Sequence, residues 1–464
     1  MSTASSALAS GAFRAITVSP LSSDVRKTDD GSKPAHHAQN GFVNPWPSFR
    51  EKYKRSMGPR VMLNQICNQP PIPKDISTLI PVHTPTWGSH FPLDTLKATW
   101  LGHACFLLEL PAPPGASRGP RIIFDPALSK RCFSSEYLGP ERITPVPCKI
   151  EEIPQVDAIV LSHNHYDHTD TSSLRTLLAL HAPAIFAPLG NAPYLTSCGF
   201  APEDVHVLDW WEACEVRVEL PRVSVGPQGK AERGDGEGGG DEDGGRKEEG
   251  VRATFKLTCT PCQHFSGRSI NDRGRTLWAS WAIEEVLPSS SPASSAPVVP
   301  PLSFSPLSSP PASSTPPSSS TSSEAVKKAE PEESAASRPP KKAYFAGDTA
   351  YRTLYPSEDP AAVPVCPAFR EIGQRLGPFD LAFIPIGAYD PAWLFSNVHA
   401  SPADSVAIFG DVRARKALAM HWGTWILTTE PVMDPPALLR EECAKAGVPE
   451  GDFDICGLGE TRVF

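Results

Sequence analysis

The sequence predicts an α/β protein whose β-sheets are covered by α-helices, and two patterns predict this class. Short apolar runs, of the length expected for buried strands and rich in β-branched and aromatic residues, recur along the chain. Between them lie stretches whose apolar residues follow helical spacing. Strands mixed with intervening helices are typical of sheets whose faces are covered by helices.

The expected elements follow one another in chain order. The strand-like segments are "ATWLGHACFLLEL" (98–110), "RIIFDP" (121–126), "DAIVLSH" (157–163), "LAFIPIG" (381–387) and "KALAMHW" (416–422). The helical segments are "DTSSLRTLLALHA" (170–182), "PADSVAIFGDV" (402–412) and "PALLREECAKAG" (436–447).

Three stretches contain too few apolar residues to join a packed core. Residues 1–40 are polar and turn-rich, which predicts a disordered tail. Residues 226–250 consist mainly of glycine and charged residues, and residues 288–340 are rich in proline and serine. Strand-like segments flank both, so we interpret each as an expanded hairpin loop, because the entropic cost of closing a loop grows only slowly with its length. The sequence therefore predicts one domain, 41–464, with disordered inserts at 226–250 and 288–340.

Charge and cysteine content exclude several classes of protein. The formal net charge of −9 and the pI near 5.8 argue against a nucleic-acid partner. The 11 cysteines are scattered, which fits reduced thiols and an intracellular, cytoplasmic or peripheral membrane location. The start of the chain is rich in serine and alanine and has Arg14 but no acidic residue before Asp24. This composition leaves a mitochondrial location open, although a plain tail is the expected structure.

One loop carries an unusual concentration of metal-ligand residues. The segment "LSHNHYDHTD" (161–170) contains His163, His165, Asp167 and His168 directly after a strand-like run. Imidazole nitrogen and carboxylate oxygen are ligands that zinc accepts in proteins. The alternative to a metal site is a solvated polar loop or a helix N-cap at Asp167. Three histidines at this spacing argue against that alternative.

Three further candidate ligands follow other strand-like runs. They are His264 after "FKLTCTPCQ", Asp348 after "AYFAG" and His421 after "KALAM". A single histidine at a strand end is usually a packed polar residue, but four strand ends with ligand residues suggest convergence on one site. The resulting seven ligands exceed the capacity of one tetrahedral ion. The sequence thus predicts two Zn²⁺ ions per chain, sharing a bridging carboxylate.

These motifs resemble a known enzyme family. "SHNHYDH", "FAGDTAY", "PIGAYDPAW" and "HWGTW" are similar to the metallo-β-lactamase fold. Together with "FVNPWPSF", "GPERITPVPC" and "CQHFSGR" they resemble the N-acylphosphatidylethanolamine-hydrolysing phospholipase D family over most of residues 42–430. The HxHxDH element alone marks only the superfamily, whereas the longer motifs are more specific. The resemblance implies a four-layer αβ/βα sandwich with the metal site at the edge between two sheets.

The resemblance also implies a role for each candidate residue. One zinc ion would be held by His163, His165 and His264. The other would be held by Asp167, His168 and His421, with Asp348 bridging the two. We expect Asp167 and Asp348 to act in catalysis together with His399, which falls on the family's headgroup-pocket histidine. The residue before it is Val398 here and glutamine in relatives, which bears on headgroup preference. His103 and Asp125 match family positions near the site and are expected to support the ligands.

The implied reaction is hydrolysis of N-acylphosphatidylethanolamine to N-acylethanolamine and phosphatidic acid. Such a substrate requires contact with a membrane surface, and the chain has no apolar run long enough to span one. Trp46 and Phe49 in "NPWPSFREKYKR" (44–55), or the segment "MLNQICNQPPIP" (62–73), could lie on the bilayer. The apolar residues near His399 could line a groove for acyl chains, and they are Trp393, Leu394 and Phe395.

Two rival functions remain open at this point. The same fold could hydrolyse a small substrate such as a sugar-phosphate lactone, or it could be a non-catalytic scaffold that recruits partners through the insert at 288–340. The complete ligand set argues against the scaffold. The sequence leaves a homodimer open and does not fix the acyl-chain preference.

Overall fold

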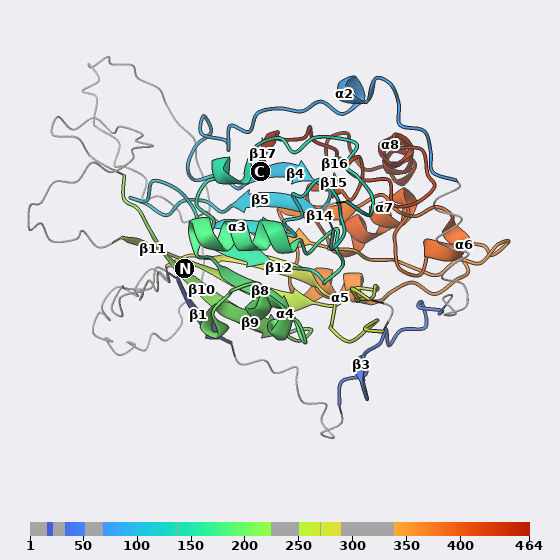
Figure 1. Cartoon of the computed structure of the whole chain (residues 1–464), viewed down its shortest axis with the longest axis horizontal. Helices are drawn as coiled ribbons and strands as arrows, with labels where there is room; N and C mark the ends of the chain where they lie inside the picture. The colour runs from blue at the N-terminus through green and yellow to red at the C-terminus, as the bar shows by residue number, and fades with distance from the viewer. Residues whose placement is uncertain are drawn as a thin grey trace, which may run out of the picture. The chain divides into compact units, whose positions relative to one another are not determined.

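Two mixed β-sheets form the centre of the protein in a computed structural model, which describes residues 16–21, 33–51, 68–135, 137–223, 250–269, 271–288 and 338–464. The first sheet has the strand order β1-β10-β11-β12-β13-β14-β15-β16, and the second has the order β17-β4-β5-β6-β7-β8-β9 (Figure 1). The described residues up to Val286 and from Lys341 to Phe464 belong to one compact unit.

The strands of the first sheet are β1 (Ile16–Pro20), β10 (Ala213–Leu220), β11 (Val251–Thr260), β12 (Ser280–Val286), β13 (Lys342–Phe345), β14 (Leu381–Pro385), β15 (Ala417–Met420) and β16 (Phe453–Asp454). Those of the second sheet are β17 (Thr461–Val463), β4 (Lys97–Gly102), β5 (Cys105–Glu109), β6 (Arg121–Phe124), β7 (Ala158–Val160), β8 (Ala184–Pro188) and β9 (Val205–Leu208). A short hairpin joins β2 (His37–Ala38) and β3 (Gly41–Phe42).

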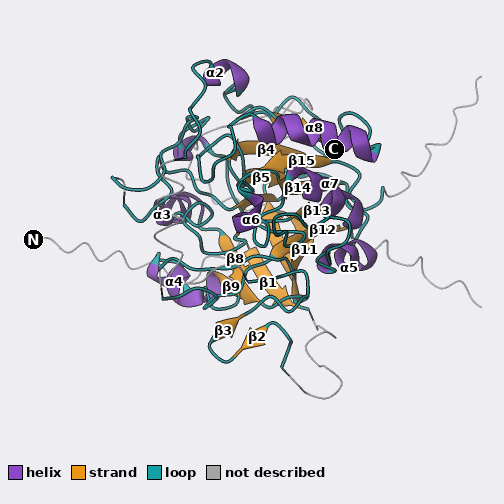
Figure 2. Ribbon diagram, turned by 90° about the vertical axis from the view of Figure 1, so that its right-hand side faces the viewer, coloured by secondary structure: helices purple, strands orange, loops and turns teal. Residues whose placement is uncertain are grey.

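Helices cover the outer face of each sheet. Figure 2 shows α3 (Thr171–His181) and α4 (Ala192–Ser197) on one side of the strands, and α5 (Ala368–Arg375), α7 (Pro402–Asp411) and α8 (Asp434–Ala446) on the other. The short helices α2 (Ile76–Leu79) and α6 (Ala392–Phe395) lie in connecting segments. The order helix, sheet, sheet, helix confirms the predicted four-layer sandwich.

The alternation of side chains along the strands explains the layers. In the second sheet, Phe106 and Phe124 point toward the first sheet, whereas Leu107 and Ile123 pack in the cluster that contains residues of α3. The ring of Phe124 stacks on Phe345 of the first sheet at a centroid distance of 4.5 Å. Strands buried on both faces read as continuous apolar runs, which is why these segments stand out in the sequence.

Strand direction brings one end of each sheet to the same edge. β6, β7 and β8 are parallel, and β4 runs the same way because it is antiparallel to β5, which is antiparallel to β6. In the first sheet β13, β14 and β15 are parallel, and β11 runs with them. The carboxyl ends of these strands are therefore where side chains from distant parts of the sequence can meet.

Two expectations about the elements need correction. The run 98–110, which reads as one apolar segment, forms the two strands β4 and β5, because the chain turns at Gly102 (φ 108°) and His103 (φ 53°). The interpretation of residues 1–40 as a tail is wrong for 16–20, which form β1 and pair with β10 through five residues, Ile16 opposite Val218. It is also wrong for 33–40, where His36 is buried and β2 pairs with β3. A five-residue strand with no fully buried residue carried too weak a pattern to stand out from its polar surroundings.

Both predicted inserts lie largely outside the described residues, at 224–249 and 289–337. The strands that flank them nevertheless pair directly. Leu220 lies opposite Val251 in the β10–β11 pair, and Glu284 lies opposite Lys342 in the β12–β13 pair. The two long connections therefore join adjacent antiparallel strands, as the hairpin interpretation predicts. Among the described helices, none is both long and apolar enough to cross a membrane.

We expect that a short turn can replace residues 289–337 without loss of fold or activity. The β12–β13 ladder, including the hydrogen bond from Glu285 N–H to Lys341 C=O (2.9 Å), is complete without that segment. Shortening a flexible loop lowers its closure entropy cost, so stability should stay equal or rise slightly. Thermal unfolding and hydrolase assays of the shortened chain test this, and a loss of activity with an intact fold would contradict it.

Candidate metal centre

The histidine loop after β7 is held by its own hydrogen bonds. The hydroxyl of Thr169 donates to the backbone oxygen of His163 (2.6 Å), and its N–H donates to the backbone oxygen of His165 (2.8 Å). Asp170 then caps α3, accepting a hydrogen bond from the N–H of Ser172. The chain thus turns at once from a buried strand into a helix, and the histidines lie in the turn between them.

Two groups of potential ligands meet at the shared edge of the sheets. One contains His163, His165, His264 and Asp348, and the other contains His103, Asp167, His168 and His421. Within each group the nearest nitrogen or oxygen atoms all lie within 4.8 Å of one another. The structure therefore brings together all seven residues that the sequence singles out as ligands, although their roles as ligands stay a prediction.

In the first group the imidazoles face one another closely. His163 Nε2 lies 2.8 Å from His165 Nδ1, and His264 Nε2 lies 3.3 Å from the same atom. His264 arrives from the end of β11, and its Nδ1 contacts the backbone oxygen of Val398 (2.7 Å). That contact fixes the orientation of the ring and leaves Nε2 directed at the other two. This contact uses the backbone oxygen of residue 398, so it does not depend on whether the side chain there is valine or glutamine.

Asp348 lies between the two groups. Its Oδ2 is 3.2 Å from His168 Nε2 and 3.6 Å from His264 Nε2, and its Oδ1 is 3.0 Å from His421 Nε2. Gly347 makes this placement feasible, with a φ of 58° and with Ser162 so close that an added Cβ would lie 2.5 Å from the serine Cβ. A carboxylate that reaches both groups is suited to bridge two ions.

The second group is oriented by buried partners. Asp125, at the end of β6, contacts His168 Nδ1 through Oδ2 (2.7 Å) and accepts hydrogen bonds from Ser162 N–H and Oγ–H. His103 Nε2 lies 3.1 Å from Asp167 Oδ2, and His421 Nε2 lies 3.5 Å from the same oxygen. Carboxylate partners of this kind hold a ligating imidazole in one orientation and raise its basicity.

Three of these residues have unusual backbone conformations. His103 (φ 53°), Asp125 (φ 38°) and His421 (φ 64°) all lie in the left-handed region, which costs energy for residues other than glycine. Each directly follows a strand: β4, β6 and β15. The left-handed residue turns each side chain from the strand end into the centre, so packing of the strands compensates local strain at the site.

Burial keeps the histidines of the first group neutral. It is the main cause that lowers the pKa of His163 and His264 well below the usual range and the pKa of His165 to about 4. Neighbouring imidazoles lower these pKa values further, whereas Asp348 raises them without offsetting burial. Neutral imidazole is the form that binds a metal ion, so these three rings are available as ligands without loss of a proton.

Around Asp348 the balance of charges is the reverse. Burial is the largest single effect and alone would raise the pKa of Asp167 and Asp348, but the charge of His168 and the contacts with neighbouring histidines together outweigh it and hold both pKa values well below the usual range. Burial likewise is the largest effect on His421 and opposes its charged form, but Asp348 and Asp167 together outweigh it and raise that pKa to about 9. The two carboxylates thus require compensating positive charge, supplied by protons or by metal ions that replace them.

The centre fits divalent metal ions by a second criterion. Several of its buried polar atoms make no hydrogen bond of acceptable angle within the described ranges, although His168 Nε2 and His421 Nε2 lie close to Asp348. They are His103 Nδ1, His168 Nε2, Asp348 Oδ1, His399 Nδ1, and both ring nitrogens of His421. Unsatisfied buried polar atoms are rare in folded proteins and costly. A pair of ions with nitrogen and oxygen ligands would satisfy those that point into the centre.

His399 joins the centre from the segment after α6. Its Nδ1 lies 3.9 Å from Asp348 Oδ2, and its ring centroid lies 5.2 Å from that of His264 and 5.3 Å from that of His421. Burial lowers its pKa to about 4. Of the apolar residues before it, Leu394 is buried and Trp393 is 45% exposed.

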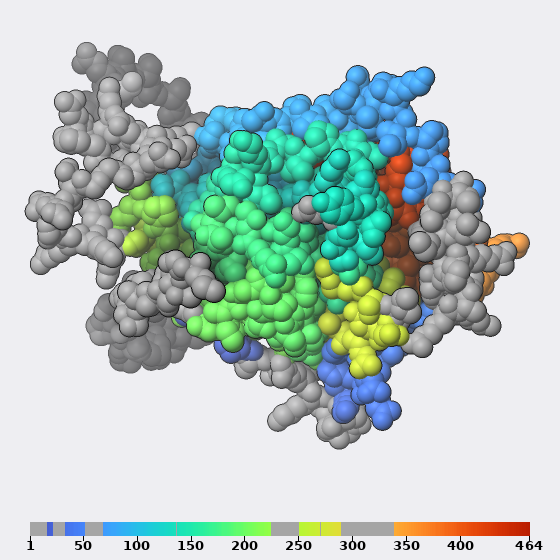
Figure 3. Space-filling view, in the orientation of Figure 1, coloured from blue at the N-terminus to red at the C-terminus, as the bar shows by residue number. Residues whose placement is uncertain are grey.

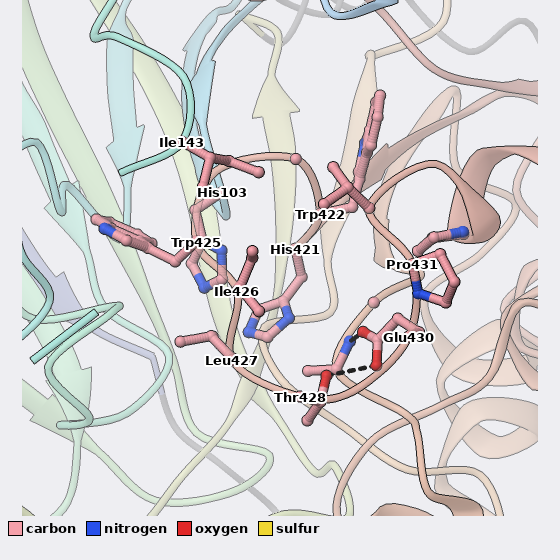
Figure 4. A pocket seen from close by; sticks show the side chains of 15 residues that line it. His103, Ile143, His421, Trp422, Trp425, Ile426, Leu427, Thr428, Glu430 and Pro431 are labelled. Carbon is pink, nitrogen blue, oxygen red and sulfur yellow. Dashed lines mark hydrogen bonds between the residues drawn. The ribbon is translucent and has the colours of Figure 1, made fainter. Parts of the chain in front are cut away.

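An apolar pocket opens beside the second group of ligands. Figure 4 shows His103 and His421 at one side of it and Trp425, Ile426 and Leu427 along its wall. At the other side, the carboxylate of Glu430 accepts hydrogen bonds from the Thr428 hydroxyl and from backbone N–H groups, so its charge is used within the loop. The pocket holds only about 30 Å³, room for little more than a water molecule, so a ligand held at the metal centre could place no more than a small group here.

Sequence reasoning missed several contributors to the centre. Ser162 links Asp125 to the histidine loop, and Asn44 donates from its side chain to the backbone oxygen of His264 (2.7 Å). The segment that contains Asn44 reads in the sequence as a surface element. In the structure Trp46 of that segment stacks on Trp210 at 5.2 Å, so it packs against the domain.

Comparisons with known proteins agree with this architecture. Residues 120–290 and 323–422 match the model of the beta-lactamase superfamily domain. The N-acyl-phosphatidylethanolamine-hydrolyzing phospholipase D 1 of Caenorhabditis elegans is 27% identical over 400 residues, which cover 85% of this chain and 83% of that protein. The mitochondrial N-acyl-phosphatidylethanolamine-hydrolyzing phospholipase D of Saccharomyces cerevisiae is 27% identical over 456 residues, or 91% and 75%. The family resemblance seen in the motifs is confirmed, and the chain belongs to the beta-lactamase superfamily as a metal-dependent hydrolase.

Proposed function

We propose that this chain is a zinc-dependent phosphodiesterase that hydrolyses N-acylphosphatidylethanolamine to N-acylethanolamine and phosphatidic acid. The observation that carries the proposal is the pair of ligand groups that share Asp348. The substrate named for the relatives from Caenorhabditis elegans and Saccharomyces cerevisiae supports the choice of substrate. Nothing in the described geometry favours a sugar-phosphate lactone.

The proposed assignment uses the two groups as they stand. His163, His165 and His264 would hold one zinc ion, Asp167, His168 and His421 the other, and Asp348 would bridge them. When bound, two zinc ions lower the pKa of a shared water and stabilise negative charge on phosphate oxygens. Asp125 and His103 keep His168 and Asp167 in position through the contacts at 2.7 and 3.1 Å.

His399 is suited to contact the phosphate group. Its ring is neutral near pH 7, because burial lowers its pKa to about 4, and its Nδ1 has no hydrogen-bond partner among the described residues. A neutral imidazole can donate one hydrogen bond to a phosphate oxygen without adding charge to the site. The small pocket along Trp425, Ile426 and Leu427 offers apolar surface next to His421 for a small group of the substrate.

A membrane-facing surface would complete the site. The loop 129–141 exposes Phe133, Tyr137 and Leu138, at 46%, 87% and 62%. It borders a groove that also contains Arg175 and Arg268, and this groove adjoins the histidine loop at Tyr166. Exposed aromatic and aliphatic residues beside basic residues suit an anionic bilayer. The loop is a better candidate than Trp46 and Phe49, which are partly buried; the segment 52–67 lies outside the described residues.

Other parts of the proposal concern partners and location. The name of the yeast relative places that protein in mitochondria. For this chain a mitochondrial, cytoplasmic or peripheral membrane location, and a homodimer, stay predictions.

Asp348→Asn should lose both zinc and activity. The amide keeps the shape of the side chain but removes the charge that both ligand groups share. Changes to outer residues of metal sites cost about 10- to 100-fold, so we expect the loss of this central ligand to cost at least about 100-fold in turnover. Elemental analysis and lipid hydrolysis measure the two effects.

The matched control is Asp452→Asn, which removes a surface carboxylate paired with Lys416. It should retain zinc and turnover. Near-normal activity in a folded Asp348→Asn protein would rule out the bridging role.

Hydrolysis in oxygen-18 water tests the reaction itself. Attack of water oxygen at phosphorus places the label in phosphatidic acid and releases N-acylethanolamine unlabelled. Label in a free fatty acid would instead show cleavage of an acyl ester. If the protein hydrolysed a sugar-phosphate lactone and not the phospholipid, the proposed substrate would be wrong and the small-substrate function would be favoured.

Replacing Phe133, Tyr137 and Leu138 by alanine should weaken binding to vesicles of phosphatidylcholine and phosphatidylserine. Burying one large apolar side chain contributes ~1.5–3 kcal/mol, so loss of three should lower affinity by at least about tenfold. Leu180→Ala on α3 is the matched control, because Leu180 is 44% exposed outside the loop. Equal vesicle binding by the triple variant and the control would exclude the loop as the membrane contact.

A further inference from the structure

A third group of metal-ligand residues lies outside the hydrolytic centre. It consists of the adjacent histidines His36 and His37 and of Asp209, which directly follows β9. His36 Nε2 lies 2.7 Å from Asp209 Oδ1, and His37 Nε2 lies 2.7 Å from Asp209 Oδ2. The segments that meet here are more than 170 residues apart in the sequence.

The backbone turns so that two successive side chains point the same way. In extended chain, adjacent side chains point to opposite faces. Here the N–H of His37 donates to the backbone oxygen of Pro34 (2.9 Å), which closes a turn just before β2. The two rings then lie edge to face with their centroids 4.6 Å apart. The turn thus directs both Nε2 atoms at one carboxylate.

The surroundings hold each of these groups in place. The ring of His36 stacks on Trp210 at 4.2 Å, and the N–H of Trp210 donates to Asp209 Oδ1 (2.8 Å). His36 and Asp209 are buried, whereas the side chain of His37 is 26% exposed. A preorganised ligand set with one exposed member allows an ion to enter from solvent.

We propose that His36, His37 and Asp209 hold a further zinc-class divalent ion, distinct from those of the hydrolytic centre. Two imidazoles and one carboxylate form a ligand set that zinc uses in proteins, with a fourth position left for water. The ligand atoms are as close here as in the hydrolytic centre, where His163 Nε2 and His165 Nδ1 lie 2.8 Å apart. Hydrogen bonding to Asp209 needs both rings to carry their proton on Nε2, whereas binding an ion needs the other tautomer, with the proton on Nδ1 and Nε2 free.

The ion would stabilise the packing of the segment 33–51 against the residues after β9. This segment supports the hydrolytic centre directly: Asn44 donates to the backbone oxygen of His264, and the Ser48 hydroxyl donates to Gln263 Oε1 (2.6 Å). Figure 3 shows the segment, in blue, at the surface against the yellow residues after β11, where the N–H of Phe42 donates to Gly274 C=O (2.7 Å). The proposed ion would thus stabilise one end of the segment 33–51, whose other end contacts the backbone next to His264.

Zinc content of the purified full-length chain tests this. After loading with Zn²⁺ and removal of loosely bound metal, His37→Gln should hold about one ion fewer than the wild type, because the three-ligand set would be incomplete. Glutamine can still donate a hydrogen bond to Asp209, so the variant separates metal binding from hydrogen bonding. His90→Gln is the matched control, since His90 is exposed and outside all ligand groups.

A second measurement needs no variant. Acylation of histidine by diethylpyrocarbonate, read by peptide mass spectrometry, should fall several-fold at His36 and His37 when Zn²⁺ is added to metal-free wild-type protein. Equal zinc contents in the wild type and His37→Gln, or acylation unchanged by Zn²⁺, would overturn the proposal. Neither readout depends on which substrate the hydrolytic centre acts on.

Discussion

A carboxylate buried among imidazoles is the constraint on which this structure depends. Asp348 is 2% exposed, and it lies within 4 Å of His163, His168, His264, His399 and His421. A buried charge is tolerated only where opposite charge and hydrogen bonds compensate it. Every strand end around it supplies part of that compensation. The parallel direction of β13, β14 and β15, and the close approach allowed by Gly347, are what place the carboxylate there.

Each of the two sheets supplies part of the residues of the metal centre. Strands β4, β6 and β7 of the second sheet bring His103, Asp125 and the histidine loop. Strands β11, β13 and β15 of the first sheet bring His264, Asp348 and His421, the residues that complete both groups of ligands. Neither sheet alone holds a complete ligand set, so packing between them, as in the stack of Phe124 on Phe345, also sets the spacing of the ligands.

How much of this could be predicted from the sequence depends on distance along the chain. His163, His165, Asp167 and His168 are adjacent in sequence, and His264, Asp348 and His421 each follow an apolar run, so local pattern was sufficient to find them. The contact between His264 and the backbone oxygen of Val398, and the pair formed by His36 and Asp209, join segments over 130 residues apart. No local pattern records such contacts. The strand β1 was missed because a short edge strand of partial burial resembles a polar tail.

The left-handed backbone of His103, Asp125 and His421 has an evolutionary consequence. Glycine adopts that conformation at lower cost than histidine or aspartate. A gene copy freed from catalysis would therefore gain stability by exchanging these residues, and selection for folding alone would remove the site. Glycine at the ends of β4, β6 and β15 would thus mark a descendant that keeps the sandwich and has lost the residues of the hydrolytic centre.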